Sequence, residues 1–421
     1  MKHNAVALAL TAAGLLSTGT ALAQTSYSFS GFGTLGATHN DNRDADFIAN
    51  RFQPNGPGRS SPTMFGVDTK AGVQASVQIG NDLSAVVQAV TDHRFDNSYA
   101  PRFEWANLKY QVSKDLYVRA GRVVAPVFLV SDSRNVGYAQ TMVRMPVEVY
   151  GQNPITYLDG VDFGYRMNIA DGTLSIVATS GVVKTTPQPG MGVRGHGSLL
   201  NFTYERGNST FRIGGFKDKV DLHGDALGQM LLPFQYAALF GVTYSGPTPI
   251  SAGLKNKLID LGYAYDNGTW LGQAEYIQAR FNAASLGSDA AYAMGGYRTG
   301  KFTPFVAYAK SITKTGTSVP QAVSPGGFIG DQIAYGINVI NAQTTGTLAN
   351  QHTISLGARY DVLKNVALKL QYDRIHKPGS TTTPNSGWIK MGTPSYPSLY
   401  ADAAQKDISL NLLTVTVDFV F

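Results

Sequence analysis

The chain has 421 residues, a formal net charge of +6 and no cysteine. Charged residues make up only 15% of it, against about 25% in soluble domains, and glycine and aromatic residues are abundant. This composition excludes an intrinsically disordered chain, a disulfide-stabilised scaffold and cysteine-based zinc, haem or iron–sulfur sites.

The N-terminus has the three parts of a secretory signal peptide. A basic start at Lys2 is followed by an apolar stretch at 5–16 and by the small-residue sequence at 21–23. We therefore expect residues 1–23 to be a signal peptide and residues 24–421 to form the exported protein. No later apolar run approaches the roughly 18 residues that suggest a transmembrane helix.

The exported chain alternates between apolar and polar residues with a period of two. The pattern is clearest at 66–79, 160–168, 353–360 and 367–373, where one parity is apolar and the other is polar or glycine. Such alternation predicts β-strands with one apolar and one polar face. Two segments, 102–112 and 407–421, do not keep one clean parity, and bulges can produce such shifts.

The connections between these strands alternate between short turns and long loops. Seven short turns carry Gly, Asn, Asp or Ser, as at Asp171-Gly172 and Asp266-Asn267-Gly268. Eight longer polar stretches lie at about 39–61, 96–101, 125–159, 183–196, 220–255, 282–289, 314–350 and 377–406. Fifteen connections join 16 strands and place both ends of the exported chain on the short-turn side.

This arrangement predicts an all-β fold, a transmembrane antiparallel β-barrel of about 16 strands. Closure pairs every backbone group, which an open sheet in lipid cannot do. A barrel of this size is too wide for side chains to fill, so its lumen would hold water. Segment 220–255 is interpreted as one loop, although a strand at 234–245 would add a hairpin and give 18 strands.

The end of the chain carries the most specific family feature. The C-terminal strand alternates apolar residues on one face and ends on an aromatic residue, with Leu413, Val415, Val417, Phe419 and Phe421. Further characteristic stretches lie at 117–122, 136–146, 295–301 and 356–361. On these features the chain resembles the Gram-negative (proteobacterial) trimeric outer-membrane porins over essentially its whole exported length. Their acidic Pro-Glu-Phe-Gly-Gly loop motif is absent, so their ion preference is not carried over.

The resemblance implies a location and partners. It implies a homotrimer in the outer membrane of a Gram-negative bacterium, surrounded by lipid and lipopolysaccharide. It also implies that the barrel-assembly machinery reads the terminal strand ending at Phe421.

The resemblance further implies that the third long loop, 125–159, folds into the lumen and narrows it. Charged rings at a constriction determine which ions pass. The candidate constriction residues in this loop are Asp132, Arg134, Tyr138, Arg144, Glu148 and Asp159. By parity, the candidate basic residues of the pore wall are Lys70, Arg119, Arg166, Arg359 and Lys369. Of these, Lys70, Arg359 and Lys369 can form a basic patch opposite acids of the loop; the alternative is dispersed, solvated lumen charges.

The predicted function is passive diffusion of small hydrophilic solutes and ions, with a mild anion preference suggested by the net charge. The alternative is a substrate-specific porin in which Tyr138, Tyr150, Tyr157 and Arg144 bind a sugar or a small organic acid. Barrel enzymes commonly have 10 or 12 strands and cluster their catalytic residues at one rim. Adhesion or phage reception through 314–350 and 377–406 would be a secondary role.

Several motif matches carry no function. The G-x-G-x-x-G sequence at 31–36 lies inside an alternating strand, and the P-loop-like stretch at 295–301 lacks the Ser or Thr that binds magnesium. The seven His residues are dispersed, and the basic residues are spread singly along strands. We therefore expect no enzyme activity, no cofactor, no metal and no nucleic-acid partner.

Overall fold

The computed structural model describes residues 25–50, 53–153, 155–188, 190–244, 253–282, 286–315, 322–345, 350–378, 389–391 and 407–421. The predicted signal peptide lies outside these residues. No helix in the described ranges is both long and apolar enough to cross a membrane.

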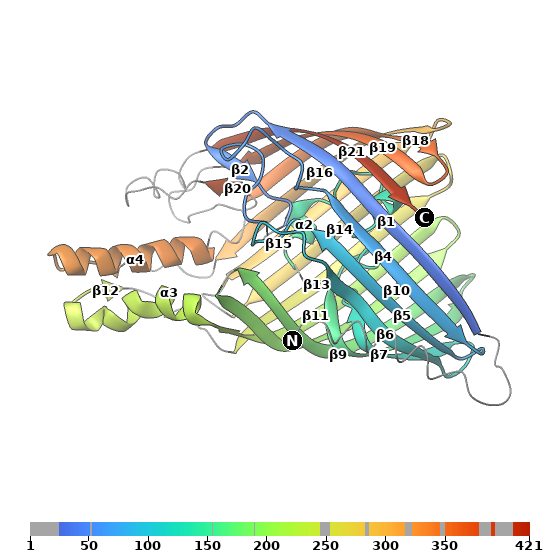
Figure 1. Cartoon of the computed structure of the whole chain (residues 1–421), viewed down its shortest axis with the longest axis horizontal. Helices are drawn as coiled ribbons and strands as arrows, with labels where there is room; N and C mark the ends of the chain where they lie inside the picture. Colours follow the sequence, from blue (N-terminus) through green and yellow to red (C-terminus); the bar gives the residue numbers. More distant parts are fainter. Residues whose placement is uncertain are drawn as a thin grey trace.

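Sixteen antiparallel strands form one closed barrel, which confirms the predicted architecture (Figure 1). The strands are β1(Thr25–Asn40), β4(Lys70–Ile79), β5(Leu83–Asp92), β6(Arg102–Gln111), β7(Leu116–Val124), β8(Tyr157–Ile169), β9(Gly172–Gln188), β10(Met191–Arg206), β11(Ser209–His223), β13(Leu254–Asp266), β14(Trp270–Phe281), β15(Leu286–Tyr297), β16(Phe302–Thr315), β18(Gln351–Leu363), β19(Val366–Lys377) and β21(Ile408–Val420). Each pairs with its sequence neighbours in this series. β1 pairs with both β4 and β21, which closes the sheet on itself.

The connections differ from the predicted pattern at two places. Residues 183–196 are not a long loop, because they continue β9 and β10 up to a tight connection between Gln188 and Met191. The connection after β14 is likewise shorter than expected, since β15 begins at Leu286. Among its described residues, segment 220–255 adds no hairpin to the barrel and holds a helix instead, so the strand count of 16 stands.

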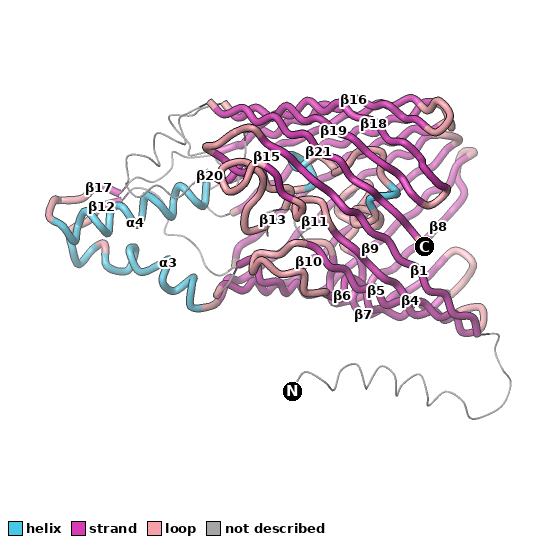
Figure 2. Tube along the Cα trace, turned by 45° about the horizontal axis from the view of Figure 1, so that its top comes forward, coloured by secondary structure: helices cyan, strands magenta, loops and turns pink. Residues whose placement is uncertain are grey.

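Smaller elements occupy the long-loop end. They are β2(Ala45–Phe47), β3(Thr63–Met64), α3(Asp225–Tyr236), the 3-10 helix η2(Ala238–Phe240), β12(Thr243–Tyr244), β17(Ala322–Val323), α4(Phe328–Thr345) and β20(Ile389–Met391). Helices α3 and α4 project together from this end of the barrel (Figures 1 and 2). They share a small apolar core that includes Phe234, Ala334 and Ile337.

The outer face of the barrel changes character along its strands. On β11, Phe211 and Ile213 point outward near the short-turn end, and Lys217 and Lys219 follow on the same face toward the long-loop end. Phe216, between them, points inward and is buried. Strand β9 has 17 residues, whereas about 9–11 suffice to cross a bilayer. The strands therefore continue beyond the apolar zone, and there the outer face is polar.

This change of the outer face from apolar to polar explains why the sequence of β21 does not keep one clean parity. No bulge or phase change occurs in it, because Leu410, Leu412, Thr414 and Asp418 all face inward in one unbroken register. Its inward residues nearest the long-loop end, Leu410 and Leu412, are apolar because they pack in a core beneath the loops, for example with Phe47. In 102–112, by contrast, a bulge does occur at the pairing of β5 with β6.

The G-x-G-x-x-G match has a packing explanation. Gly33 of β1 lies opposite Phe419 of β21, and the aromatic ring covers the glycine so closely that a Cβ atom would collide with it. Gly31 lies in the same way under the ring of Phe421. These glycines make room for cross-strand aromatic rings.

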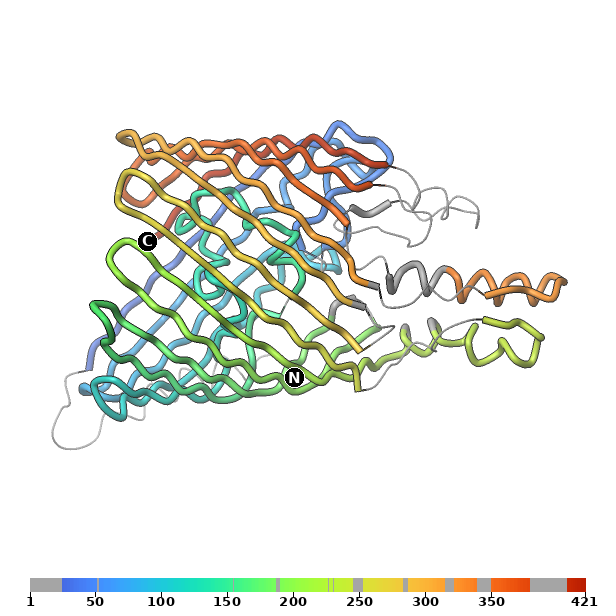
Figure 3. Tube along the Cα trace, turned by 180° about the vertical axis from the view of Figure 1, so that it is seen from behind, coloured from blue at the N-terminus to red at the C-terminus, as the bar shows by residue number. Residues whose placement is uncertain are grey.

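The segment between β7 and β8, residues 125–156, lies inside the barrel, where Figure 3 shows it in teal and green behind the wall strands. It contains the 3-10 helix η1(Gly137–Ala139) and the short helix α2(Val147–Tyr150). We call this segment the lumen loop.

Candidate functional site

The lumen loop is attached on one side to the wall formed by β11 to β16. The backbone N–H of Leu129 donates to Oε1 of Glu275 at 2.9 Å, and the Tyr150 hydroxyl donates to Oε2 at 2.7 Å. Arg212 donates to the carbonyl of Pro126 and pairs with Asp260 at 3.1 Å. This side of the loop therefore covers the wall's two carboxylates.

Apolar packing completes this attachment. Buried loop residues Val127, Phe128 and Val149 share one core with the inward residues Ile277 and Tyr292 of β14 and β15. Asp260 and Glu275 are both almost completely buried beneath it. Because the loop covers these acids, they do not line open space in the lumen.

The opposite side of the lumen loop meets the expected basic patch. Lys369 donates to the carbonyls of Gly137 (2.7 Å) and Met142 (3.1 Å), and Arg359 donates to the carbonyl of Tyr138 (2.6 Å). Lys70 donates to the carbonyl of Arg134 at 3.3 Å. The patch thus faces the loop's backbone carbonyls and not its acids, unlike the suggested arrangement of the patch opposite acids of the loop.

Arg144 fixes the loop to both neighbouring walls. Its guanidinium pairs with Asp68 at 2.6 Å and with Asp373 at 2.8 Å. Burial lowers the pKa of Arg144, but the two carboxylates raise it by more, so the net shift is upward and the charge is retained. This side chain is a structural clamp, with little of its charge left for a passing ion.

Glu148 is also buried and does not face open space in the lumen. It is only 1% exposed, and its Oε1 accepts hydrogen bonds from Gln351 at 2.6 Å and from Thr353. Burial raises the pKa of this carboxyl above its usual value, although the two hydrogen bonds oppose the shift. Its role here is to hold α2 against β18.

Three other candidates have different surroundings. Tyr138 donates its hydroxyl to the carbonyl of Lys364 at 2.6 Å, and Arg359 stacks on its ring. Asp132 is exposed in the lumen loop. Asp159 was assigned to the loop wrongly: β8 begins at Tyr157, so Asp159 lies in this strand and pairs with Arg122 at 2.7 Å. It shares the outward parity of Val161 and Phe163, so it does not face the constriction.

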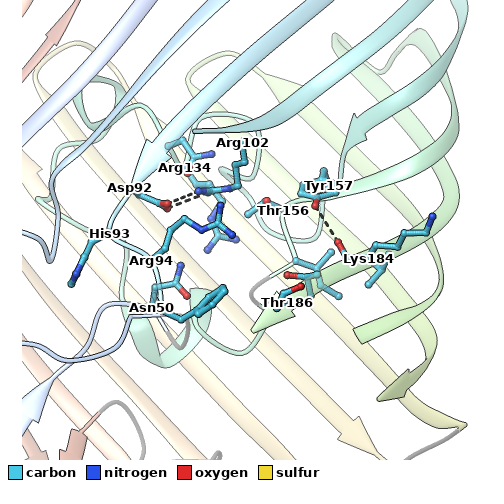
Figure 4. Close-up of a pocket in the computed structure, with 15 residues that line it drawn as sticks. Asn50, Asp92, His93, Arg94, Arg102, Arg134, Thr156, Tyr157, Lys184 and Thr186 are labelled. Atoms are coloured by element: carbon cyan, nitrogen blue, oxygen red, sulfur yellow. Dashed lines mark hydrogen bonds and ion pairs between the residues drawn. The ribbon is translucent and has the colours of Figure 1, made fainter. Parts of the chain in front are cut away.

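Open space remains along the wall formed by β4 to β9. An outer cavity of about 280 Å³ is lined by Asp92, Arg94, Arg102 and Arg134 (Figure 4). Arg102 forms a bidentate pair with Asp92, and Lys184 at the cavity's edge extends away from the arginines. A middle cavity of about 120 Å³ shares Asp92 and Arg134 with it and reaches Lys70.

An inner cavity of about 310 Å³ lies near the short-turn end. Lys109, Lys114 and Arg166 line it, with Asp115 as its acid. Arg119, which faces inward nearby, pairs with Asp162 at 3.0 Å and is neutralised. Of the predicted wall residues, Lys70 and Arg166 therefore line open space, whereas Arg119, Arg359 and Lys369 are engaged in contacts.

Several residues of this path were missed from the sequence. Arg102 lies beside the bulge of β6, where parity fails. Arg94 follows β5 in a loop, where alternation gives no information. Asp418, which pairs with Lys369 at 2.9 Å, was hidden by the supposed phase change of β21. A register that is counted from the C-terminal Phe421 would have placed Asp418 inside.

No protein-family profile matches this sequence, and no curated protein matches it. Solved structures do share its fold. The outer membrane channel DcaP of Acinetobacter baumannii is 12% identical with a TM-score of 0.57, and the match covers 96% of this chain and 100% of that one. An anion-selective porin from Comamonas acidovorans is 14% identical with a TM-score of 0.52, covering 94% and 100%. OmpT of Vibrio cholerae, in a trimer form, is 11% identical with a TM-score of 0.51, covering 94% and 99%.

Proposed function

We propose that this protein is an outer-membrane porin that forms a water-filled channel for passive diffusion of small hydrophilic solutes and favours anions. The closed barrel supports this function, because 16 strands enclose more space than the lumen loop fills. The likeness to known porins and channels supports it as well. Residues 1–23 would direct export and be removed.

One observation supports the anion preference above all others. Besides Lys184 at the edge of the outer cavity, six basic side chains line the three cavities and form no ion pair within the described part of the chain: Lys70, Arg94, Lys109, Lys114, Arg134 and Arg166. Of the three acids that line the same cavities, Asp68 and Asp92 pair with arginines, and only Asp115 forms no ion pair among the described residues. Because Asp260, Glu275 and Glu148 are buried, the positive charges dominate the open path.

We also propose a homotrimer, with one part of the outer wall as the contact between protomers. The outward faces of β1, β4, β5 and β6 carry no Asp, Glu, Lys or Arg within the described strands. They present small and apolar residues such as Val73 and Val87, both about 45% exposed. Native mass spectrometry of the detergent-solubilised protein should give three times the protomer mass.

Liposomes that contain the refolded protein provide the test of transport. A small organic anion should enter severalfold faster than a cation of the same size, because the unpaired basic residues attract it. Replacing Lys70, Arg94 and Arg134 with Gln should remove the difference. Arg374→Gln, on the outer face of β19, is the matched control and should retain it. Absence of flux through a folded barrel would contradict the channel, and equal entry would contradict the anion preference.

The substrate-specific alternative has weaker support. Tyr150 and Arg144 are committed to Glu275, Asp68 and Asp373, and Tyr138 is bonded to a turn. Tyr157 lines the outer cavity, and Tyr150 and Arg144 line the middle cavity with side chains that already have partners. Saturable block of the channel current by a sugar or organic acid would favour this alternative, and strictly linear flux would count against it.

A further inference from the structure

Two histidines meet on the outer face of the barrel at its long-loop end. His352 of β18 and His376 of β19 are paired in register on neighbouring strands (Figure 1). They share the outward parity of Ile354 and Tyr372, which are exposed and lie farther toward the short-turn end of the same strands. Residues in register have Cβ atoms about 4.5–5.5 Å apart. The sequence hides this pair, because most of both strands and the turn between them separate the two histidines.

The two rings are spaced as the ligands of one metal ion would be. Their centroids are 5.0 Å apart and their planes are inclined at 51°. Metal–nitrogen bonds of about 2.0–2.1 Å at a roughly tetrahedral angle hold two imidazole centroids about 5 Å apart. The distance between the rings therefore matches a shared ion without any change in the spacing of the strands.

Ser409 orients one of these rings. Its hydroxyl lies 3.2 Å from Nδ1 of His376. When Nδ1 carries the proton and donates it to this hydroxyl, the lone pair lies on Nε2, which can then bind a metal. The ring of His352 lies beside Tyr308 and His376 and forms no hydrogen bond with any residue that the structure describes. Each histidine thus offers a ring nitrogen to a ligand.

The surroundings of the pair indicate the kind of ion. Within the described ranges no group of three or more His, Cys, Asp or Glu is arranged around a metal, so water would complete the coordination. Hard cations such as Ca²⁺ and Mg²⁺ prefer carboxylate and carbonyl oxygens. The nearby charges are basic instead, since Lys310 is in register with His352 and Arg374 precedes His376 by two residues. Imidazole ligands suit Cu²⁺, Ni²⁺ and Zn²⁺.

We propose that His352 and His376 bind one divalent transition-metal ion of this imidazole-preferring class. Among these ions Cu²⁺ binds most tightly, following the general order of affinities for nitrogen ligands. The ion links β18 to β19, and it stabilises the barrel because the unfolded chain does not hold the two rings together. The site is independent of the proposed transport, since both rings lie on the outer wall and not in the lumen.

The test uses the refolded full-length barrel without a polyhistidine tag. Isothermal titration with Cu²⁺ should give one site per chain, and the electron paramagnetic resonance spectrum of the loaded protein should show two nitrogen ligands. Ca²⁺ should not bind. His352→Gln and His376→Gln should each weaken Cu²⁺ binding at least tenfold, because loss of even an outer-shell partner typically costs about 10–100-fold. Lys310→Gln should tighten it, because the change removes a positive charge opposite His352.

His39→Gln is the matched control. His39 is exposed on the outer face of β1 and lies 2.8 Å from the Thr63 hydroxyl, with Thr63 and Leu413 in register and no second histidine. This variant should keep the Cu²⁺ affinity and stoichiometry of the parent. All the variants should conduct ions like the parent, which separates loss of metal binding from failure of the proposed channel. Equal Cu²⁺ affinity in the parent, His352→Gln and His376→Gln would overturn the proposal, as would a spectrum with a single nitrogen ligand.

Discussion

At the scale of single residues, pairing decides which charges act on a solute. Arg144 and Lys369 looked equivalent to Lys70 and Arg134 in the sequence, yet the first two are bound to buried carboxylates. Parity along a strand predicts the face on which a side chain lies, but it cannot predict the partner, which comes from another strand or from the lumen loop. This is why the wall residues were found and their roles were not.

Arg134→Gln is the most direct residue-level test of the open path. Arg134 lines both the outer and the middle cavity and forms no ion pair among the described residues. Removing its charge should lower the chloride-to-potassium permeability ratio at least twofold, measured as a reversal potential. Arg374→Gln, on the outer face, should leave that ratio unchanged. A shift of equal size in both variants would mean that the effect is not local to the lumen.

Glu148→Gln tests the pH dependence of loop attachment. Burial raises the pKa of Glu148 above its ordinary value of 4.5, so the folded barrel favours the protonated form more than the unfolded chain does. The carboxyl's contribution to stability is therefore greatest below pH 4.5 and is lost as the pH rises through the folded-state pKa. Gln does not titrate, so the variant should gain denaturant resistance relative to the parent as the pH rises from 4.5 through the folded-state pKa. A difference in denaturant resistance that does not change with pH would contradict this assignment.

At the scale of elements, alternation predicted the strands because the two faces of a barrel meet different solvents. The rule fails where a strand leaves the hydrocarbon. There the outer face becomes polar and the inner face can be covered by loops, as at Leu410 and Leu412. The same reversal made 183–196 resemble a loop, although β9 and β10 continue through it. The path of the lumen loop depends on contacts with several strands that are distant in the sequence. No pattern within residues 125–156 themselves could therefore predict it.

The closure of the barrel between β1 and β21 depends on glycine. Gly33→Val would force a side chain into the ring of Phe419, and such overpacking costs roughly 1–3 kcal/mol. The urea midpoint in lipid vesicles should fall accordingly. Gly215→Ala is the matched control, because its added Cβ meets nothing within 4 Å. Equal stability of Gly33→Val and the parent would show that the ring moves aside freely.

Arg144 is one of the side chains that hold the lumen loop against the wall. Arg144→Ala would leave Asp68 and Asp373 buried without a counter-charge, a change that typically costs about 3–5 kcal/mol. We expect the loop to detach from that wall, which should increase the mean single-channel conductance and its noise. Arg144→Lys, which keeps one charge, should have a smaller effect. Unchanged conductance in Arg144→Ala would mean that the loop's other contacts, such as those with Glu275 and Lys369, are sufficient.

At the scale of the whole molecule, charge is sorted by location. Asp260 and Glu275 lie under the lumen loop, and unpaired basic residues line the open path. A second set of basic residues, such as Lys217 and Lys257, lies on the outer face toward the long-loop end. Within the described strands, the outward faces of β1 and β4 to β6 carry no Asp, Glu, Lys or Arg. Net charge alone suggested only a mild anion preference. The fold supports that expectation, because it buries Asp260, Glu275 and Glu148 away from the water-filled side.

The central claim is an aqueous channel selective for anions. The most direct measurement is the reversal potential of single channels in a planar bilayer under a tenfold gradient of potassium chloride. We predict stepwise openings, in groups of three for a trimer, with a reversal potential displaced toward the chloride equilibrium potential. A displacement toward the potassium equilibrium potential, or no conductance from a folded barrel, would contradict the account.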